Sequence, residues 1–281
     1  MKQILLPTDF SENSWNAISY ALQLFQEERC MFHILNTYTP PIYNLEYVIG
    51  YPEQFGLVDT VRDTSRQQLH KLVNRIATDF TNNSKHEFKT YSKFNTVVSG
   101  IGAFVDSHKI DVIVMGTKGA TGAKELLFGS NTVHVFQEIK RPILAIPSGF
   151  TFKAPLKMLF PNDLELLYKE ASLKILLDIA NAHATTLNMM HVSTGHELSE
   201  KQIMNLEKIE SIFKHAPFLF HHLNNEDITV AIQQFQKKHN INFLVMINNK
   251  HSFFENLFFQ NTVNQIGFHL ETPFLVLPSE L

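Results

Sequence analysis

The stretch that decides the fold is residues 111–147, which read DVIVMGTKGATGAKELLFGSNTVHVFQEIKRPILAIP. It opens with the apolar, β-branched run 111–115, which is typical of a strand buried on both faces. Gly116 and Gly119 follow this run, and nine residues separate Gly119 from Gly129. The stretch therefore predicts a buried strand, a glycine-rich turn and then a new element that begins near Gly129.

The segment after Gly129 has a helical pattern and is followed by another strand. Residues 130–132, Ser-Asn-Thr, are all suitable N-cap residues. Apolar side chains then recur at helical spacing until the pattern stops before Pro142, and the apolar run 143–146 comes next. The whole unit is predicted to be strand, glycine turn, helix and strand.

The glycines of this unit point to an anion site. Gly116 and Gly119 allow positive φ angles and let backbone N–H groups approach a ligand closely. The helix beginning near Gly129 and Ser130 adds unpaired N–H donors and the positive end of a helix dipole. Lys118 would add a mobile cation. The alternative is that the glycines only form tight turns.

The spacing matches neither GxGxxG nor GxxxxGK[ST], the two common phosphate-binding fingerprints. It matches G-x2-G-x9-G-[ST] and so resembles the nucleotide-binding signature of the universal stress protein family. The segment ILLPTDFS at residues 4–11 is similar to the opening strand and aspartate of that family. The resemblance covers 1–148 well and 155–281 more loosely.

The resemblance implies an α/β fold of two tandem Rossmann-like (adenine nucleotide alpha hydrolase-like) domains, each with a five-stranded, mostly parallel sheet flanked by helices. Residues 1–148 would carry the intact nucleotide motif, and 155–281 would be a shorter domain with a degenerate motif. The implied ligand is ATP or another adenine nucleotide, with Mg²⁺ on its phosphates. The implied nucleotide-binding residues are Pro7, Thr8, Asp9, Thr37, Met115, Gly116, Thr117, Lys118, Gly119, Gly129, Ser130, Asn131 and Thr132.

Composition narrows the class of protein. The chain has 281 residues, 44% hydrophobic and 18% charged, which favours two globular domains. Its net charge of −3 gives no electrostatic reason to expect nucleic-acid binding, and no apolar run approaches membrane-spanning length. Pro7 and Asp9 interrupt the first apolar stretch, so no signal peptide is expected. The single cysteine, Cys30, fits a reducing compartment, and the expected location is the cytoplasm.

Strands and helices alternate along the chain, which indicates a mostly parallel sheet with helices on both faces. Ligands of such sheets bind at the carboxyl ends of strands, where the strand order reverses. Asp9, Thr37 and Gly116 all stand at predicted strand ends, so they are expected to converge. The resemblance assigns Asp9 to ribose or adenine. Its simpler interpretation is a helix-entry residue before Ser11, which is predicted to cap the following helix. Residues 38–60 are predicted to be a long loop, and helices are predicted at 61–80 and 101–108.

An internal repeat runs through the chain. The segment MLFPND at 158–163 is similar to ILLPTD at 4–9, and PFLVLP at 273–278 is similar to PILAIP at 142–147. The order of matching segments is preserved, which indicates a tandem duplication. In the second copy, the positions of the motif glycines and serine hold Ile247, Lys250, Phe259 and Gln260. We therefore expect one nucleotide for each chain.

The last strand of each copy, 143–146 and 274–277, would leave an unpaired sheet edge, which soluble proteins seldom expose. We expect the two edges to pair antiparallel within the chain as a pseudo-dimer, with a further homodimer as an additional arrangement. The linker 148–155 spans up to roughly 28 Å, which permits this pairing. The alternative is two separate domains whose edges pair between chains.

No motif for catalysis or for a resident metal is present. His221 and His222 are neighbours in a predicted strand and would point to opposite faces, so they are not expected to chelate one ion. The first hypothesis is therefore a stress-response protein that binds ATP as a regulatory module and hydrolyses it slowly at most. The alternatives are an ATP-dependent hydrolase or transferase that uses the 38–60 loop, and a nucleotide-free interaction module.

Overall fold

The computed structural model describes residues 1–39, 57–80, 83–117, 129–193, 196–224, 227–248 and 271–279. We call residues 1–147 the first half and the remainder the second half. The elements of the first half are β1 (Lys2–Pro7), α1 (Glu12–Leu24), β2 (Cys30–Tyr38), α2 (Leu57–Asp79), β3 (His86–Phe94), α3 (Val97–Ser107), β4 (Val112–Gly116), α4 (Ser130–Glu138) and β5 (Ile143–Ile146). Those of the second half are β6 (Lys157–Pro161), α5 (Glu170–Ala182), β7 (Thr186–Ser193), α6 (Glu200–Ile212), β8 (Phe218–Asn224), α7 (Ile228–His239), β9 (Phe243–Asn248) and β10 (Phe274–Pro278).

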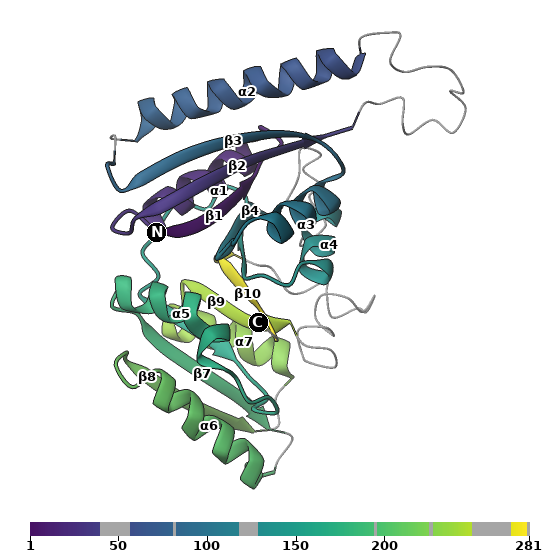
Figure 1. Cartoon of the computed structure of the whole chain (residues 1–281). Helices are drawn as coiled ribbons and strands as arrows, with labels where there is room; N and C mark the ends of the chain where they lie inside the picture. Colours follow the sequence, from purple (N-terminus) through teal and green to yellow (C-terminus); the bar gives the residue numbers. More distant parts are fainter. Residues whose placement is uncertain are drawn as a thin grey trace, which may run out of the picture.

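All ten strands form one sheet in the order β3-β2-β1-β4-β5-β10-β9-β6-β7-β8. Neighbouring strands run parallel except β5 and β10, which are antiparallel. From the centre of the sheet outward, the strand order is β5-β4-β1-β2-β3 in the first half and β10-β9-β6-β7-β8 in the second, so the two halves have the same topology. Figure 1 shows the two halves meeting at β10. The predicted α/β class, with a mostly parallel sheet flanked by helices, is confirmed.

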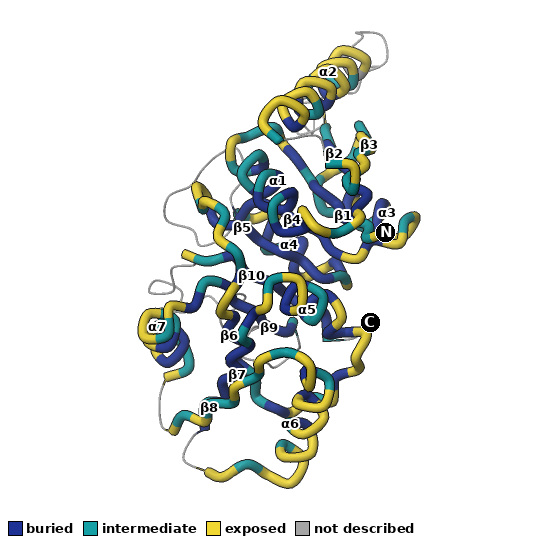
Figure 2. Tube along the Cα trace, turned by 90° about the vertical axis from the view of Figure 1, so that its left-hand side faces the viewer, coloured by how far each residue is buried: buried dark blue, intermediate teal, exposed yellow. Residues whose placement is uncertain are grey.

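Two apolar cores lie on opposite faces of the sheet. Helices α1, α2, α5 and α6 contribute to one core, and α3, α4 and α7 contribute to the other. Alternate strand residues supply the two cores, as Ile4 and Leu6 face one and Leu5 faces the other. Figure 2 shows the central strands as mostly buried, whereas α2 is mostly exposed. Burial on both faces explains why the central strands read as continuous apolar runs.

Local capping explains where several helices begin. Ser11 caps α1 by accepting a hydrogen bond from the Ser14 N–H, as the sequence predicts. Ser199 forms a reciprocal capping box with Gln202 at α6. At α4 the expectation of a cap within residues 130–132 is wrong, because Gly129 is the N-cap residue and contributes no side chain. The first N–H groups of α4 are therefore left without a side-chain acceptor from the N-cap residue.

The two halves are joined through the last strand of each. Leu275 of β10 pairs with Leu144 of β5, which confirms the antiparallel pairing predicted within the chain. Asn248 Nδ2 donates a 2.5 Å hydrogen bond to the main-chain oxygen of Phe136, and His183 Nε2 lies 2.9 Å from the Leu24 main-chain oxygen. The chain therefore closes both of these edges by itself.

The predicted loop 38–60 lies mostly outside the described residues. Its first residues continue β2 to Tyr38, and its last residues belong to α2, which begins at Leu57 and is longer than predicted. Within the ranges given above, every helix is too short or too polar to cross a bilayer.

Candidate functional site

A cavity of about 130 Å³ opens at the carboxyl ends of β1 and β4. Strand β1 is flanked by β2 and β4, so the chain leaves β1 on one side and returns on the other. This reversal of strand order is where parallel α/β sheets leave room for a ligand. The residues lining the cavity are Pro7, Thr8, Asp9, Ser14, Leu35, Thr37, Val97, Ile101, Met115, Gly116, Gly129, Ser130, Asn131 and Thr132.

One wall of the cavity is the turn between β1 and α1. Asp9 Oδ1 accepts hydrogen bonds from the Ser11 N–H at 3.0 Å and the Ser11 hydroxyl at 2.5 Å. Thr8 Oγ1 lies 2.9 Å from Ser14 Oγ and accepts the Phe10 N–H at 3.0 Å. These bonds fix the turn and leave Asp9 Oδ2 without a hydrogen-bond partner among the described residues. One carboxylate oxygen thus shapes the turn while the other remains available to a ligand.

The opposite wall is the N-terminus of α4, whose first N–H groups are open. No side chain caps this helix. The N–H groups of residues 130–132 precede the first intrahelical bond, from the Val133 N–H to the Gly129 oxygen, and have no acceptor in the described part of the chain. Three uncommitted donors and the positive end of the helix dipole therefore face the cavity.

The ends of the loop between β4 and α4 are pinned to each other. The Gly129 N–H donates to the Thr117 main-chain oxygen at 2.7 Å. Thr132 Oγ1 donates to the main-chain oxygens of Gly116, at 3.2 Å, and Thr117, at 3.4 Å. The hydroxyl of Thr132 is consumed by these bonds instead of capping its own helix. This arrangement keeps the open N-terminus of α4 against the end of β4.

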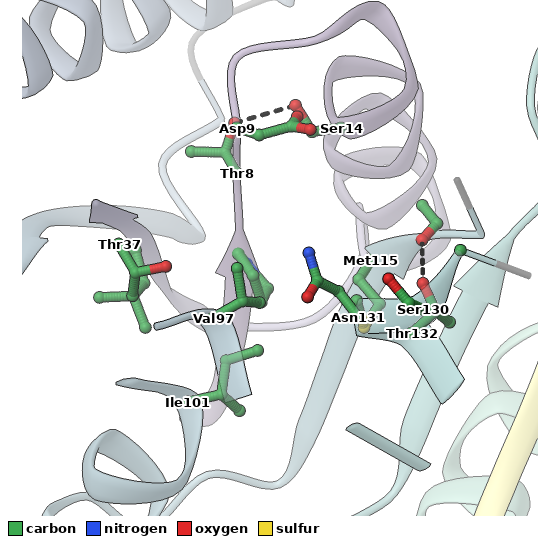
Figure 3. Close-up of a pocket in the computed structure, with 14 residues that line it drawn as sticks. Thr8, Asp9, Ser14, Thr37, Val97, Ile101, Met115, Ser130, Asn131 and Thr132 are labelled. Atoms are coloured by element: carbon green, nitrogen blue, oxygen red, sulfur yellow. Dashed lines mark hydrogen bonds between the residues drawn. The ribbon is translucent and has the colours of Figure 1, made fainter. Parts of the chain in front are cut away.

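The third side of the cavity is apolar. Figure 3 shows Thr37, Val97 and Ile101 grouped across the cavity from Ser130 and Asn131. Gly100 allows α3 to approach this side, because a Cβ at that position would clash with Thr37 Cγ2. The cavity therefore combines an anion-binding end, a carboxylate and an apolar slot.

The structure brings together most of the residues that the sequence singles out. All of them line the cavity except Thr117, Lys118 and Gly119. Thr117 is buried behind the cavity, where its N–H donates to Ile146, and the other two lie outside the described residues.

Four lining residues were missed by the sequence interpretation. They are Ser14, Leu35, Val97 and Ile101. Val97 and Ile101 are one helical turn apart, a spacing that would have placed both on one face had α3 been predicted to begin at Val97. Ser14 follows the capping Ser11 by three positions, and its hydroxyl lies beside that of Thr8 in the cavity wall.

The corresponding region of the second half is built differently. Asp163 Oδ1 accepts the Glu165 N–H at 3.0 Å, which repeats the turn of the first half. Asn162 Nδ2, however, donates to the Tyr168 hydroxyl at 3.1 Å, and Ile247 stands at the end of β9 where β4 has Gly116. Lys250, Phe259 and Gln260, the other predicted departures from the motif, lie outside the described residues.

The histidine pair of β8 divides between two sets of neighbours, as the strand geometry predicts. His221 Nε2 lies 3.1 Å from Asn188 Oδ1, whereas the His222 ring lies 5.4 Å from that of His191. In the part of the chain that the structure describes, no three His, Cys, Asp or Glu side chains gather closely enough to hold a metal ion.

Sequence comparison finds similarity between the first half of the chain and known proteins. The model of the universal stress protein family matches residues 1–147. Universal stress protein MJ0531 of Methanocaldococcus jannaschii is 26% identical over 147 residues, covering 52% of this chain and 81% of that protein. Universal stress protein MJ0577 of the same organism is 27% identical over 162 residues, covering 52% of this chain and 94% of that protein.

Similarity to solved structures extends over both halves. The crystal structure of a universal stress protein from Archaeoglobus fulgidus superposes with a TM-score of 0.70 at 19% identity, covering 99% of this chain and 98% of that one. At this identity the match shows a shared fold. The family match itself covers more than half of the sequence, and the chain therefore belongs to the universal stress protein family.

Proposed function

We propose that the first half binds ATP or another adenine nucleotide in the cavity between β1 and β4. The observation that carries this proposal is the open N-terminus of α4, which faces Asp9 across a cavity with an apolar slot. Free N–H groups at a helix start bind phosphate well, and a flat base suits an apolar slot. Family membership is consistent with this assignment.

Each part of the nucleotide has a proposed place. The phosphates lie at residues 129–132 and are also held by Lys118 and Gly119 of the preceding loop. The base lies between Thr37 and the α3 side chains Val97 and Ile101, and Asp9 accepts a hydrogen bond from the ribose. Mg²⁺ would be held through the phosphates, because Asp9 is the only carboxylate among the described lining residues and lies on the wall opposite α4.

We propose a binding and regulatory role rather than robust turnover. Among the described lining residues, Asp9 is the only acidic or basic side chain, and its Oδ1 is committed to the turn. A second group that could act as a general base toward a terminal phosphate is absent from that set. The proposed setting is a cytoplasmic stress-response protein of two domains, 1–148 and 155–281, with one nucleotide for each chain.

The test is calorimetric titration of the whole chain with Mg²⁺-ATP. We expect one site per chain, and Asp9→Ala should weaken binding by about 1–3 kcal/mol through loss of a charge-assisted hydrogen bond. Asp9→Asn keeps an acceptor for the Ser11 N–H, so it tests the loss of the negative charge while the hydrogen bond of the turn is retained. Asp163→Asn is the matched control in the second half and should leave ATP affinity unchanged.

Three results would each contradict a part of the proposal. Absence of ATP binding by the wild-type chain would remove the function, and two equivalent sites would remove the assignment to the first half. Release of ADP over many turnovers would replace the regulatory role with an enzymatic one.

A further inference from the structure

Helix α4, whose open N-terminus faces the cavity between β1 and β4, is weak on its own. It has nine residues, Ser130–Glu138, and isolated helices of that length are marginal in water. The N-cap residue Gly129 supplies no side-chain hydrogen bond, and the last turn holds no lysine or arginine that would offset the negative end of the helix dipole. Contacts outside the helix must therefore hold α4 in place.

The first turn of α4 is held from within the first half. Thr132 Oγ1 donates to the main-chain oxygen of Gly116 at 3.2 Å, and the Gly129 N–H donates to that of Thr117 at 2.7 Å. Both bonds tie the start of the helix to the end of β4. Neither of them acts on the last turn.

The last turn of α4 is held by the second half, and two contacts converge on Phe136. Asn248 Nδ2, at the end of β9, donates a 2.5 Å hydrogen bond to the Phe136 main-chain oxygen. The Phe136 ring is buried and lies 6.1 Å from the ring of Phe274 in β10, at an interplanar angle of 83° that is favourable for two aromatic rings. Figure 1 shows α4 beside β10, where the two halves meet.

The side chain of Asn248 suits this position chemically. Main-chain oxygens in the last turn of a helix lack an intrahelical partner and carry the negative end of the dipole. The Asn248 amide supplies the missing donor to one of them. Asn248 stands where the first half has Thr117, directly after Ile247, which replaces Gly116. A position that belongs to the nucleotide motif in the first half thus serves in the second half as a support for α4.

The supported turn is close to the open N–H groups of the helix. Phe136 follows Thr132 by four positions, so the two residues lie on one face of α4. Asn131 and Phe136 are separated by about 7.5 Å along the helix axis, at 1.5 Å for each residue. A helix this short moves as one body, so a shift of its last turn also displaces the N–H groups of residues 130–132. Binding groups need to be held within about 0.5 Å of their working positions.

We propose that Asn248 is a positioning residue for the phosphates of the nucleotide, and that the second half acts as a fixed support for α4. This inference rests on the proposed nucleotide function of the first half. It gives a role to the second half, whose sequence lacks the glycines of the motif. Asn248 is not among the residues that line the cavity, so it acts through α4. Its removal should weaken only ligands that carry phosphates.

The test compares the binding of Mg²⁺-ATP and of adenosine to the whole chain by calorimetric titration. Asn248→Ala removes the donor, and we expect the affinity for ATP to fall by about fivefold or more. The affinity for adenosine, which has no phosphates, should change by less than about twofold. Asn248→Asp keeps the shape of the side chain but places a carboxylate against the Phe136 oxygen and the negative end of the dipole, so it should weaken ATP further.

Asn242→Ala is the matched control. Asn242 Nδ2 also donates to a main-chain oxygen, that of Ala154 at 2.6 Å, but this bond lies within the second half. We expect Asn242→Ala to lower the urea midpoint and to leave the affinity for ATP unchanged. A loss of ATP affinity as large as that in Asn248→Ala would mean that both variants act through general stability, and it would overturn the proposal.

Hydrogen exchange of the amides in residues 130–138, measured without nucleotide, tests the support separately from binding. We expect exchange there to become faster by about fivefold or more in Asn248→Ala, with no change in α3. Unchanged exchange in α4, unchanged ATP affinity, or equal losses for ATP and adenosine would each overturn the proposal. If the wild-type chain binds no ATP, the nucleotide proposal fails, and the exchange measurement alone decides whether the second half supports α4.

Discussion

Phe10 and Leu164 occupy the same place in the two halves, and both hold a left-handed backbone with φ angles of 63° and 61°. Each directly follows the aspartate of its turn, Asp9 or Asp163. A bulky residue in this region costs roughly 1–2 kcal/mol, which neighbouring contacts must offset. Leu164 is fully buried and Phe10 packs against the same apolar core. Since the second half keeps the turn without the rest of the motif, core packing holds Asp9 in place before any ligand binds.

The strain at Phe10 can be measured with a pair of variants. Phe10→Gly and Phe10→Ala both remove the aromatic ring, but only glycine accepts a positive φ without steric cost. We expect Phe10→Gly to be more stable than Phe10→Ala by about 1 kcal/mol in urea unfolding. An alanine variant as stable as the glycine variant would mean that the turn relaxes when the ring is removed.

The apolar slot should respond to a single methyl group. Gly100→Ala places a Cβ against Thr37 Cγ2, and we expect it to lower stability by about 1–3 kcal/mol through overpacking. The variant should also weaken ATP binding, since Thr37 lines the slot. Thr37→Ser removes the clashing methyl, so the double variant should recover most of the stability. A double-mutant cycle that shows no coupling between the two positions would refute this contact.

Stability should decrease in mild acid because of His33. Burial, the largest cause, and the nearby His108 and Lys89 together lower the pKa of His33 to about 4. The ring is held by Gln3 Oε1 at 2.8 Å and the Tyr91 hydroxyl at 3.0 Å, and it faces Phe104 and His108. An unfolded histidine, with a pKa of about 6.5, takes up a proton first, so the contribution of neutral His33 is lost as pH falls from about 6.5 to about 4.

A variant at this position tests that expectation. Asn188 stands in β7 where β2 has His33, because Leu5 pairs with His33 and Leu159 pairs with Asn188. His33→Asn should flatten the dependence of the urea midpoint on pH between 6.5 and 4. The exposed His70→Asn is the control and should keep the wild-type slope. A slope that is unchanged in His33→Asn would assign the acid sensitivity to other groups.

Proline in β10 should separate the two halves. Leu275 is fully buried between β5 and β9, and proline there would remove a main-chain donor in the middle of the sheet. We expect Leu275→Pro to unfold at lower urea and to increase the radius of gyration in small-angle scattering. Leu219→Pro, in the edge strand β8, should have a smaller effect on both quantities. A wild-type chain that scatters as two separated lobes would contradict the pairing of β5 with β10.

The parts of this fold that were predictable from the sequence share one physical property. Strands such as 112–116 and 143–146 are buried on both faces, so their apolar runs are continuous and end sharply at glycine or proline. The pairing of β5 with β10 was predictable because two short, apolar edges cannot both remain exposed. The glycine spacing predicted the position of the cavity. A helix that begins soon after a buried parallel strand has its N-terminus at the carboxyl edge of the sheet.

Features that depend on distant contacts were not predictable. Residues 130–132 all have suitable capping side chains, but the tertiary position of Gly116 directs the Thr132 hydroxyl away from its own helix. Val97 was missed because the helix was predicted to begin at Ile101, one turn after the observed start of α3. The ion pair between Lys2 and Asp178 joins two residues that are far apart in sequence and have no motif in common. Such groups come together only when the two halves do.

The pairing of β5 with β10 also has a consequence for how the protein responds to dilution. Edges that pair between separate chains dissociate when the protein becomes scarce, because association depends on concentration. In this chain the partner edge is tethered, so its effective concentration is set by the linker and does not change with abundance. The fraction of molecules in which β5 pairs with β10 should therefore be the same at low and at high protein concentration.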